Sequence, residues 1–511
     1  MQTEYKVLSK RDLLAFFAMI IGMFMAILDI QIVASSLSVI GAGLSAGSDE
    51  LSWVQTSYII AEVIIIPATG FLARLLSTRI LYFTATLGFT VMSVACSMAW
   101  NIESMIVFRA LQGLFGGAMI PTAFATSFLI FSPKQRAKIS IIIGLVVTMA
   151  PTLGPTIGGY ITEVSSWHLM FLVNVLPGAF VCIVTLLWCN FDKPDHSLIN
   201  NFDYLGVFLM VVCLGSLQYL IEEGSRLGWL ESSLVISLIF IITSSFACLI
   251  YTELYSSNPI LDLKAFKNKN FCLGCIYSSI IGIGLFGAVY LLPLFLYRIA
   301  GLSALQIGIV MMVTGAFQFL SAPIAGRLYG GGLDRRLMLA IGFGFFGFGC
   351  YLDSFLTPDS RFGDFFLPQA VRGFALMFCF IPVNDIALGT MKKNEVQNAS
   401  GLYNLTRNLG GAISLAVINT TLIDNTKIYS QYLSDGVTIT DIDAISGIQG
   451  FLDGKIFDPE MASIMILNQI IQRDAFIIAI NNIFEMMAMI FVISIVLLPF
   501  SDNTNAKIEG H

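Results

Sequence analysis

Residues 13–44 read LLAFFAMIIGMFMAILDIQIVASSLSVIGAGL, and Asp29 is the only charged residue in this run. A helix of about 20 apolar residues is long enough to cross the hydrocarbon core of a bilayer. Similar uncharged runs recur to the end of the 511-residue chain, of which 56% is hydrophobic and only 12% is charged. A soluble chain of this length would divide into two or three domains with polar surfaces. The sequence therefore predicts an all-α polytopic membrane protein.

Fourteen apolar runs bounded by charged residues are long enough to be transmembrane helices. They lie at residues 13–34, 51–73, 80–99, 104–130, 137–161, 168–189, 204–221, 233–253, 271–293, 303–325, 336–355, 363–386, 401–421 and 475–499. The basic residues test this assignment, because Lys and Arg in short loops stay on the cytoplasmic side. With the N-terminus in the cytoplasm, eighteen of the 27 basic residues fall in cytoplasmic segments and six outside. Both termini are therefore predicted to be cytoplasmic.

The longest predicted connection, residues 422–474, lies on the outer side of the membrane. It is polar, and its stretch 464–471 has the pattern of an amphipathic surface helix. Two interpretations stay open: a segment that meets another protein, or a disordered connector. Loops of this length are uncommon and are usually either functional or disordered.

Similar motifs recur about 256 to 260 residues apart, which indicates an internal repeat. Pro67–Gly70 closes the second predicted span, and Pro323–Gly326 closes the tenth. Arg109-x-x-Gln112-Gly113 begins the fourth span, and Gln369-x-x-Arg372-Gly373 begins the twelfth with the two polar residues exchanged. The repeat predicts two related bundles with a cavity between them.

The predicted domain organisation follows from this repeat. Residues 1–190 form an N-terminal six-helix bundle, and residues 191–262 form a linker with two inserted transmembrane helices. Residues 263–511 form a C-terminal six-helix bundle that includes the long extracytoplasmic loop 422–474. We expect the functional site where the two bundles meet, near the middle of the membrane.

Three charged residues inside predicted spans are candidates for proton coupling: Asp29, Glu62 and Arg109. Each ionisable side chain at the centre of a span costs ~2.5–3.5 kcal/mol on insertion, so it needs a partner, a wet cavity or a function. Asp29 and Arg109 lie at comparable depths and are expected to pair, either as a proton site or as a structural lock between helices. Glu62 is expected to bind a proton or a cationic drug, or to make a structural hydrogen bond.

Candidate substrate-binding residues lie beside these charges. Tyr58 is on the same helical face as Glu62, one turn earlier, and Gln112 is on the same face as Arg109. Arg372 is interpreted as the counterpart of Arg109 in the second repeat. Aromatic residues make up 12% of the chain and methionines number 21, which suits a soft cavity for varied apolar ligands.

Several patterns point to no enzyme and no cofactor. The strings at 282–287 and 342–347 match GxGxxG, but both lie inside apolar spans, where glycines let helices pack closely. No GxxxxGK[ST] motif occurs, and the three histidines offer little for a metal or catalytic centre. Cys272 and Cys275 form a CxxC without a second pair, so helix packing explains them better than metal binding. The basic residues form no cluster typical of nucleic-acid binding.

Motifs along most of the chain carry a family resemblance. They are Leu28-Asp29, Trp53–Tyr58 with Glu62, Gly70–Arg74, Arg109–Gly113, Gly154-Pro155-Thr-Ile-Gly158-Gly159 with Trp167–Pro177, and Ala399–Gly411, which contains Arg407. Together they resemble the major facilitator superfamily, and within it the fourteen-span drug/proton antiporter branch of the EmrB/QacA type. The resemblance implies conformational roles for Gly70, Arg74, Gly113, Gly154, Pro155, Gly158, Gly159 and Arg407.

By this resemblance the chain exports drugs from the cytoplasm in exchange for protons, by alternating access, from a bacterial inner membrane. No cofactor is implied beyond the proton gradient. The resemblance also implies a periplasmic adaptor of the EmrA type and an outer-membrane channel of the TolC type. One departure stands out: the chain has Arg74 where the superfamily usually has an acid, and Ser77 where it has a glycine. A gating salt bridge built on that acid is therefore not expected here.

Two other functions remain open from the sequence. The first is an exporter dedicated to one metabolite or siderophore, which would need ligand-specific polar side chains in its cavity. The second is a membrane receptor or scaffold that transports nothing, in which Asp29 and Glu62 could be neutralised without harm.

Overall fold

The structure is a computed structural model that describes residues 9–256, 259–392, 395–435 and 459–501. Within these residues all regular structure is helical. The long helices of the first part are α1 (Lys10–Ser35), α4 (Trp53–Leu76), α5 (Thr78–Ser97), α6 (Ile102–Ile130), α7 (Pro133–Val164), α9 (Val175–Trp188), α10 (Tyr204–Glu223) and α11 (Ser233–Tyr255). Those of the second part are α12 (Lys269–Arg298), α13 (Ala304–Gly330), α14 (Arg335–Leu352), α15 (Phe362–Leu388), α16 (Val396–Asp435) and α18 (Pro459–Ser494).

Thirteen segments of the described chain are long and apolar enough to cross a membrane. They correspond to thirteen of the fourteen predicted spans. The remaining one, residues 401–421, lies within α16, which is helical throughout but more polar and is not among the thirteen. The fold is thus an all-helical membrane bundle, as the hydropathy pattern predicts.

The helices pack as two groups joined along two seams. In the first group α4 packs on α6, α1 on α7, and α5 on α6 and α9. In the second group α12 packs on α16, and α14 and α13 pack on α15. The seams between the groups are α7 against α13 and α4 against α16, while α10 packs on α11 and on α4. The predicted division at residues 1–190, 191–262 and 263–511 stays a prediction.

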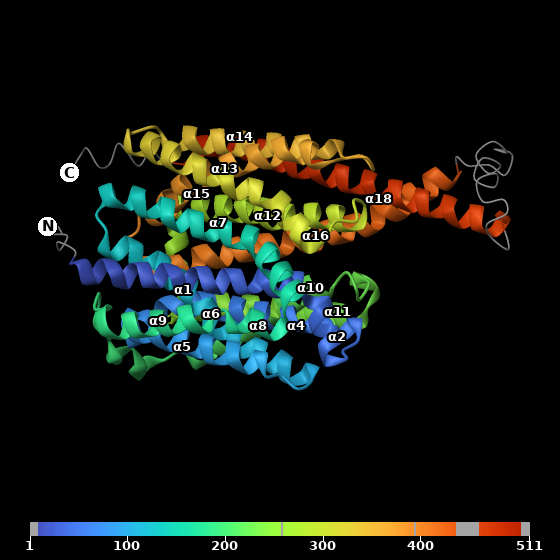
Figure 1. The fold of residues 1–511 in the computed structure, drawn as a ribbon. Coiled ribbons are helices and arrows are strands. Elements are labelled where there is room, and N and C mark those ends of the chain that lie inside the picture. Colours follow the sequence, from blue (N-terminus) through green and yellow to red (C-terminus); the bar gives the residue numbers. More distant parts are fainter. Residues whose placement is uncertain (1–8, 257–258, 393–394, 436–458, 502–511) are drawn as a thin grey trace.

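The two ends of the bundle differ. The start of α1 and the end of α18 lie at one end, which we call the termini end, and parts of α16 and α18 extend past the other end, which we call the projecting end (Figure 1). Both helices are long, with 40 and 36 residues. Gln472 of α18 donates a hydrogen bond to Ser430 of α16 over 2.6 Å, and Asn482 donates to Tyr429 over 2.5 Å. These bonds hold the two helices side by side.

The predicted outer connection 422–474 is helical at both ends. α16 continues to Asp435 and α18 begins at Pro459, while residues 436–458 lie outside the described part of the chain. The predicted surface helix at 464–471 is the first part of α18 and not a separate element. Hydropathy marks where the apolar stretch ends, but a polar helix with no interior Gly or Pro continues beyond it. No Gly or Pro occurs between Gly411 and Asp435.

Candidate functional site

Asp29 and Arg109 form a buried ion pair in the first helix group. The Arg109 Nη1 atom lies 2.5 Å from Asp29 Oδ2, and the side chains are 0% and 2% exposed. The predicted pair between the first and fourth spans is therefore present. Arg109 Nε also donates to the Val54 carbonyl oxygen of α4 over 3.1 Å, which ties α1, α4 and α6 together.

Three uncharged polar residues complete this cluster. Asp29 Oδ1 accepts hydrogen bonds from Gln112 Nε2 over 3.2 Å and from Asn174 Nδ2 over 2.7 Å. The Ser93 hydroxyl of α5 accepts from the same two amides over 2.7 Å and 3.1 Å. Asn174 directly precedes α9. The Asp29 carboxylate thus accepts three hydrogen bonds, counting that from Arg109, and sequence reasoning missed Ser93 and Asn174.

Tyr58 belongs to the same cluster. The Arg109 guanidinium lies over its ring, 4.2 Å from the centroid, and its hydroxyl donates to the Ala26 carbonyl oxygen over 3.4 Å. The backbone of Tyr58 lies where a Cβ at Gly113 would be, so glycine is required for this close crossing of α4 and α6. Both Tyr58 and Gln112 are fully buried among residues of this group. Their roles in substrate binding stay predictions.

Glu62 lies one turn along α4 and faces the other helix group. Its side chain is 3% exposed, and its carboxyl group lies beside the side chain of Asn408 on α16. Gly117 of α6 lies against the Glu62 backbone, so α6 covers the other side. Glu62 is therefore held at the seam between the two groups, and Asn408 is a partner that sequence reasoning did not identify.

A second buried ion pair lies in the second helix group. Arg372 Nη2 on α15 lies 2.8 Å from Asp353 Oδ2, and the two side chains are 2% and 0% exposed. Asp353 begins a short 3-10 helix, Asp353–Phe355, directly after α14. Arg372 is thus a buried counterpart of Arg109, as interpreted from the repeat. Its acid was missed and lies at the end of α14 rather than on the first helix of the group.

Arg372 lines a small cavity where the two groups meet. The cavity holds about 20 Å³, room for about one water molecule, and its wall includes Thr152 of α7 together with Thr314 and Gln369. The Thr314 hydroxyl donates to the Gln369 side-chain oxygen. The substrate role of Arg372 stays a prediction, but its polar neighbours include a residue of the first group.

Arg407 is buried among aromatic rings from both groups. Its guanidinium lies 5.1 Å from the ring centroid of Phe124, 5.2 Å from Phe380 and 4.9 Å from Tyr403, and its Nε donates to Ser278 over 3.3 Å. It forms no ion pair within the part of the chain that the structure describes. Phe124 is on α6, so Arg407 bridges the groups by a cation–π contact.

The predicted glycine motifs lie at helix crossings. The backbone of Asn398 lies where a Cβ at Gly70 would be, so α4 and α16 approach closely near the termini end. Ser400 beside it donates to the Pro121 carbonyl oxygen of α6 over 2.8 Å. Gly154 packs against Gln31 of α1. The neighbouring motif residues Pro155, Gly158 and Gly159 also lie on α7, and both of these glycines are buried.

A carboxylate that sequence reasoning missed joins the groups at the termini end. Asp192 accepts hydrogen bonds from the Thr78 backbone N–H over 2.9 Å and the Thr78 hydroxyl over 2.6 Å, at the start of α5. It also accepts from Gln397 Nε2 over 3.1 Å, at the start of α16. Asp192 therefore places an acid between the starts of α5 and α16, although the connection from α4 to α5 has no acidic residue of its own.

Arg74, the residue that replaces the usual acid, lies close by. Its carbonyl oxygen accepts a hydrogen bond from the Asp195 N–H over 2.9 Å. Hydrogen bonds from Ser197 hold the pKa of the Asp195 carboxyl below its usual range. The Arg74 backbone therefore anchors the segment that carries Asp192.

The sequence that forms these two helix groups is matched by a family model. The model is that of the Major Facilitator Superfamily, and it matches residues 19–415. The chain belongs to the Major Facilitator Superfamily. Members of this superfamily are transporters and not enzymes, as the sequence patterns predicted.

Among relatives of known name, the chain is 40% identical to the colistin resistance protein EmrB of Acinetobacter baumannii, over 86% of this chain and 85% of that protein. It is 30% identical to the multidrug export protein EmrB of Escherichia coli, over 95% and 94%. It is 29% identical to the fatty acid resistance protein FarB of Neisseria gonorrhoeae, over 93% of each. The predicted EmrB-type branch of the superfamily is confirmed.

Solved structures agree on the fold. The human organic anion transporter MFSD10 (TETRAN) superposes with a TM-score of 0.59 at 11% identity, over 95% of this chain and 99% of that chain. A bacterial homologue of the human lysosomal transporter Spinster superposes with a TM-score of 0.56 at 11% identity, over 97% and 98%. At this identity the likeness concerns the superfamily fold alone.

Proposed function

We propose that this chain exports amphipathic drugs and similar toxic compounds in exchange for protons. The observation that carries the proposal is the position of Glu62, buried at the seam between α4 and α16 with Asn408 of the opposite group as its partner. A carboxyl group at a moving seam changes its surroundings when the seam opens. Its affinity for a proton then differs between the two conformations, which is what coupling requires.

The geometry favours Glu62 over Asp29 as the proton carrier. Asp29 accepts three hydrogen bonds inside one helix group, including one from Arg109. Protonation would weaken all three, and removing the negative charge would leave Arg109 buried without its counter-ion. Asp29 and Arg109 therefore act in this proposal as a structural lock that holds α1, α4 and α6 in one rigid unit.

Alternating access follows from the contacts at the termini end. There α16 packs on α4 at Gly70 and is bonded to α6 and to Asp192. Opening this end would separate α4 from α16, break the Asp192–Gln397 bond and change the environment of Glu62 in the same motion. The binding of a proton by Glu62 and the binding of cargo between the groups would then be coupled, because both depend on whether the seam between α4 and α16 is open.

The amphipathic class of cargo is supported by the relatives, whose names refer to multidrug export, colistin resistance and fatty acid resistance. In our proposal the chain lies in a bacterial inner membrane with its termini in the cytoplasm. An adaptor of the EmrA type would then meet the projecting ends of α16 and α18, and a channel of the TolC type would continue the path outward.

The test reconstitutes the protein in liposomes and follows export of ethidium with and without an imposed pH gradient. We expect gradient-driven export that is lost in Glu62→Gln. Glu485→Gln is the matched control, because Glu485 is also an acid in a transmembrane segment but lies exposed on α18. Export that ignores the gradient in the unmodified protein would overturn the proposal.

The same assay separates the two alternatives. An exporter dedicated to one metabolite would ignore ethidium and fatty acids alike. A receptor or scaffold would move no compound at all, and Glu62→Gln would then have no transport to lose.

A further inference from the structure

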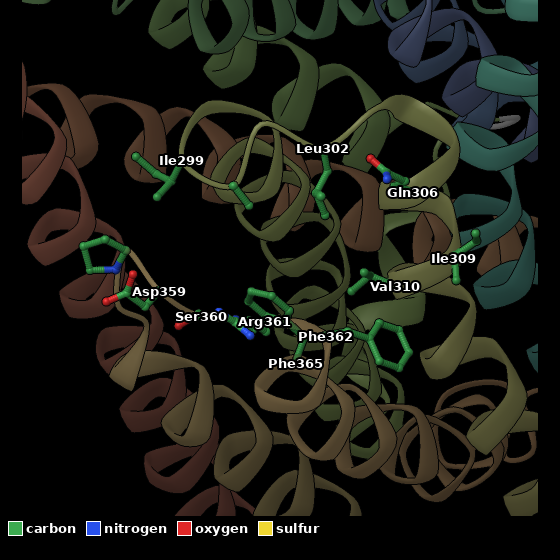
Figure 2. A pocket seen from close by; sticks show the side chains of 12 residues that line it. Ile299, Leu302, Gln306, Ile309, Val310, Asp359, Ser360, Arg361, Phe362 and Phe365 are labelled. Atoms are coloured by element: carbon green, nitrogen blue, oxygen red, sulfur yellow. The ribbon is translucent and has the colours of Figure 1, made fainter.

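A pocket of about 560 Å³ opens at the projecting end of the second helix group, away from the seams that close the termini end. It lies between the end of α12, the start of α13 and the start of α15 (Figure 2). Its walls are mainly apolar, with Leu302, Ile309, Val310 and Phe362 among the lining residues. Small-molecule sites of proteins have volumes of roughly 300–1,000 Å³, so the pocket has the size of a drug-like ligand.

The pocket also carries one charge of each sign. Asp359 and Arg361 belong to the segment that connects Asp353–Phe355 to α15, and both line the pocket (Figure 2). Neither forms an ion pair with another residue that the structure describes. Gln306 of α13 adds an uncharged polar group on the opposite wall. An apolar chamber with these groups suits an amphipathic molecule whose polar part is anionic, cationic or zwitterionic.

The same two helices, α13 and α15, line both the pocket and the small cavity beside Arg372. On α15, Phe365 lines the pocket, while Gln369 and Arg372 line the cavity; their spacing of four and seven residues puts all three on one helical face. On α13, Val310 lines the pocket, and Met311 and Thr314 line the cavity. Phe365 is 1% exposed and packs edge-on against Phe295 of α12, 6.0 Å between ring centroids. Phe365 thus separates the pocket from the cavity where the two helix groups meet.

We infer that this pocket is the release site of the transporter, where an amphipathic cargo molecule is held after it leaves the space between the groups and before it leaves the protein. The inference rests on the proposed export function and adds to it where the cargo goes. Cargo is a better occupant than a membrane phospholipid because the same two helices, α13 and α15, also line the small cavity whose wall includes Thr152 of the opposite group. Phe365 acts as the barrier between the two spaces.

The first test fills the pocket. Ile309 is 47% exposed and lines it, so Ile309→Trp reduces its volume without burying a larger side chain in the packed interior. Leu320→Trp is the matched control, since Leu320 lies on the same helix, is 57% exposed and does not line the pocket. In liposomes with a pH gradient we expect a several-fold slower export of ethidium by Ile309→Trp and an unchanged rate for Leu320→Trp. Equal rates for both variants would overturn the inference.

The second test reports occupancy directly. The fluorescence of the unmodified protein is subtracted from that of each variant. A brominated fatty acid is then expected to quench the tryptophan fluorescence of Ile309→Trp more strongly than that of Leu320→Trp. Brominated phospholipid is expected to quench the tryptophan at 320 more strongly. If phospholipid quenched both equally, the pocket would be filled by lipid and the inference would be wrong.

The third test concerns charge. Arg361→Gln is expected to slow export of a fatty acid relative to ethidium, and Asp359→Asn is expected to do the reverse. Unchanged relative rates in both variants would contradict the assignment of these two groups to cargo. If the unmodified protein moved neither compound, the export function itself would fail and this inference with it, whereas normal export with inert pocket variants would overturn the inference alone.

Discussion

Arg109 and Arg372 are two buried arginines that occupy related places in the repeat and have different surroundings. Arg109 is paired with Asp29, and the pair is enclosed by the amides of Gln112 and Asn174. Arg372 is paired with Asp353, but its guanidinium nitrogens and both Asp353 oxygens lack well-aligned hydrogen bonds in the described part of the chain. The Cys350 thiol is a further neighbour of Arg372. One site has its hydrogen bonds largely satisfied, and the other does not.

This difference indicates which site is structural and which can change. A buried polar network whose members are satisfied makes a structure rigid, whereas unsatisfied buried groups are costly and can be stabilised by water or a ligand. Arg109 therefore holds the first group together. Arg372, which lines the small cavity between the groups, has hydrogen-bonding capacity left for water or cargo.

The largest expected effect is the loss of stability when the cluster around Asp29 and Arg109 is broken. Asp29→Ala leaves Arg109 buried without a counter-ion, and breaking one partner of a buried pair costs ~3–5 kcal/mol. We expect a strongly lowered thermal midpoint and little folded protein after extraction in detergent. Asp359→Ala, which alters an acid of the outer pocket, should leave the midpoint unchanged. Normal stability of Asp29→Ala would mean that the cluster is not the lock we describe.

The second effect is smaller and sharpens the comparison. Arg372→Gln leaves Asp353 without its counter-ion, but a carboxyl group can take up a proton and become neutral, whereas the Arg109 left by Asp29→Ala stays charged. We therefore expect a loss of stability of ~1–3 kcal/mol, below that of Asp29→Ala. Export in liposomes should fall more than stability does, because the cavity between the groups loses its cation. If Arg372→Gln were as unstable as Asp29→Ala, the two sites would be equivalent and the comparison would fail.

The third effect concerns the termini end. Asp192→Ala removes the carboxylate that accepts from Thr78 at the start of α5, and a lost helix cap costs ~0.5–2 kcal/mol. It also removes the bond to Gln397, so we expect the termini end to open more often. Spin labels on the starts of α5 and α16 would report a longer distance between the two groups.

Asp334→Ala is the matched control for this change. Asp334 caps α14 at the equivalent place in the second group, where it accepts from the Arg336 N–H over 2.9 Å, and no contact of its side chain with the first group is seen among the described residues. The control should lose similar stability without a change in the distance distribution. A similar opening in both variants would show that the helix cap, and not the bridge to Gln397, controls this end.

Much of the fold could be predicted because hydropathy reports directly on a helix that must cross a bilayer. The repeat of the Arg109 and Arg372 motifs also predicted that these two arginines occupy related buried places. The extent of α16 and α18 could not be predicted, because outside the membrane a polar helix and a polar loop have similar composition. Helix ends are the least certain feature of such assignments.

The candidate site could be predicted only where a charge stood inside an apolar run. Asp29, Glu62 and Arg109 were visible for that reason. Asn174, Ser93 and Asn408 were not, because uncharged polar residues hardly alter a hydropathy average and their partners are distant in sequence. Asp353 lies at the very end of its predicted span and Asp192 shortly after another, where an acid is normally a solvated residue at the membrane surface. Only the packing of the helices shows what the two acids contact.

The most direct test of the account is proton release from the purified protein in weakly buffered detergent when ethidium is added. If Glu62 exchanges its proton for cargo, the unmodified protein releases protons on binding, Glu62→Gln releases none, and Glu485→Gln behaves like the unmodified protein. Proton release that persisted in Glu62→Gln would contradict the assignment of the coupling carboxyl group to the seam between α4 and α16.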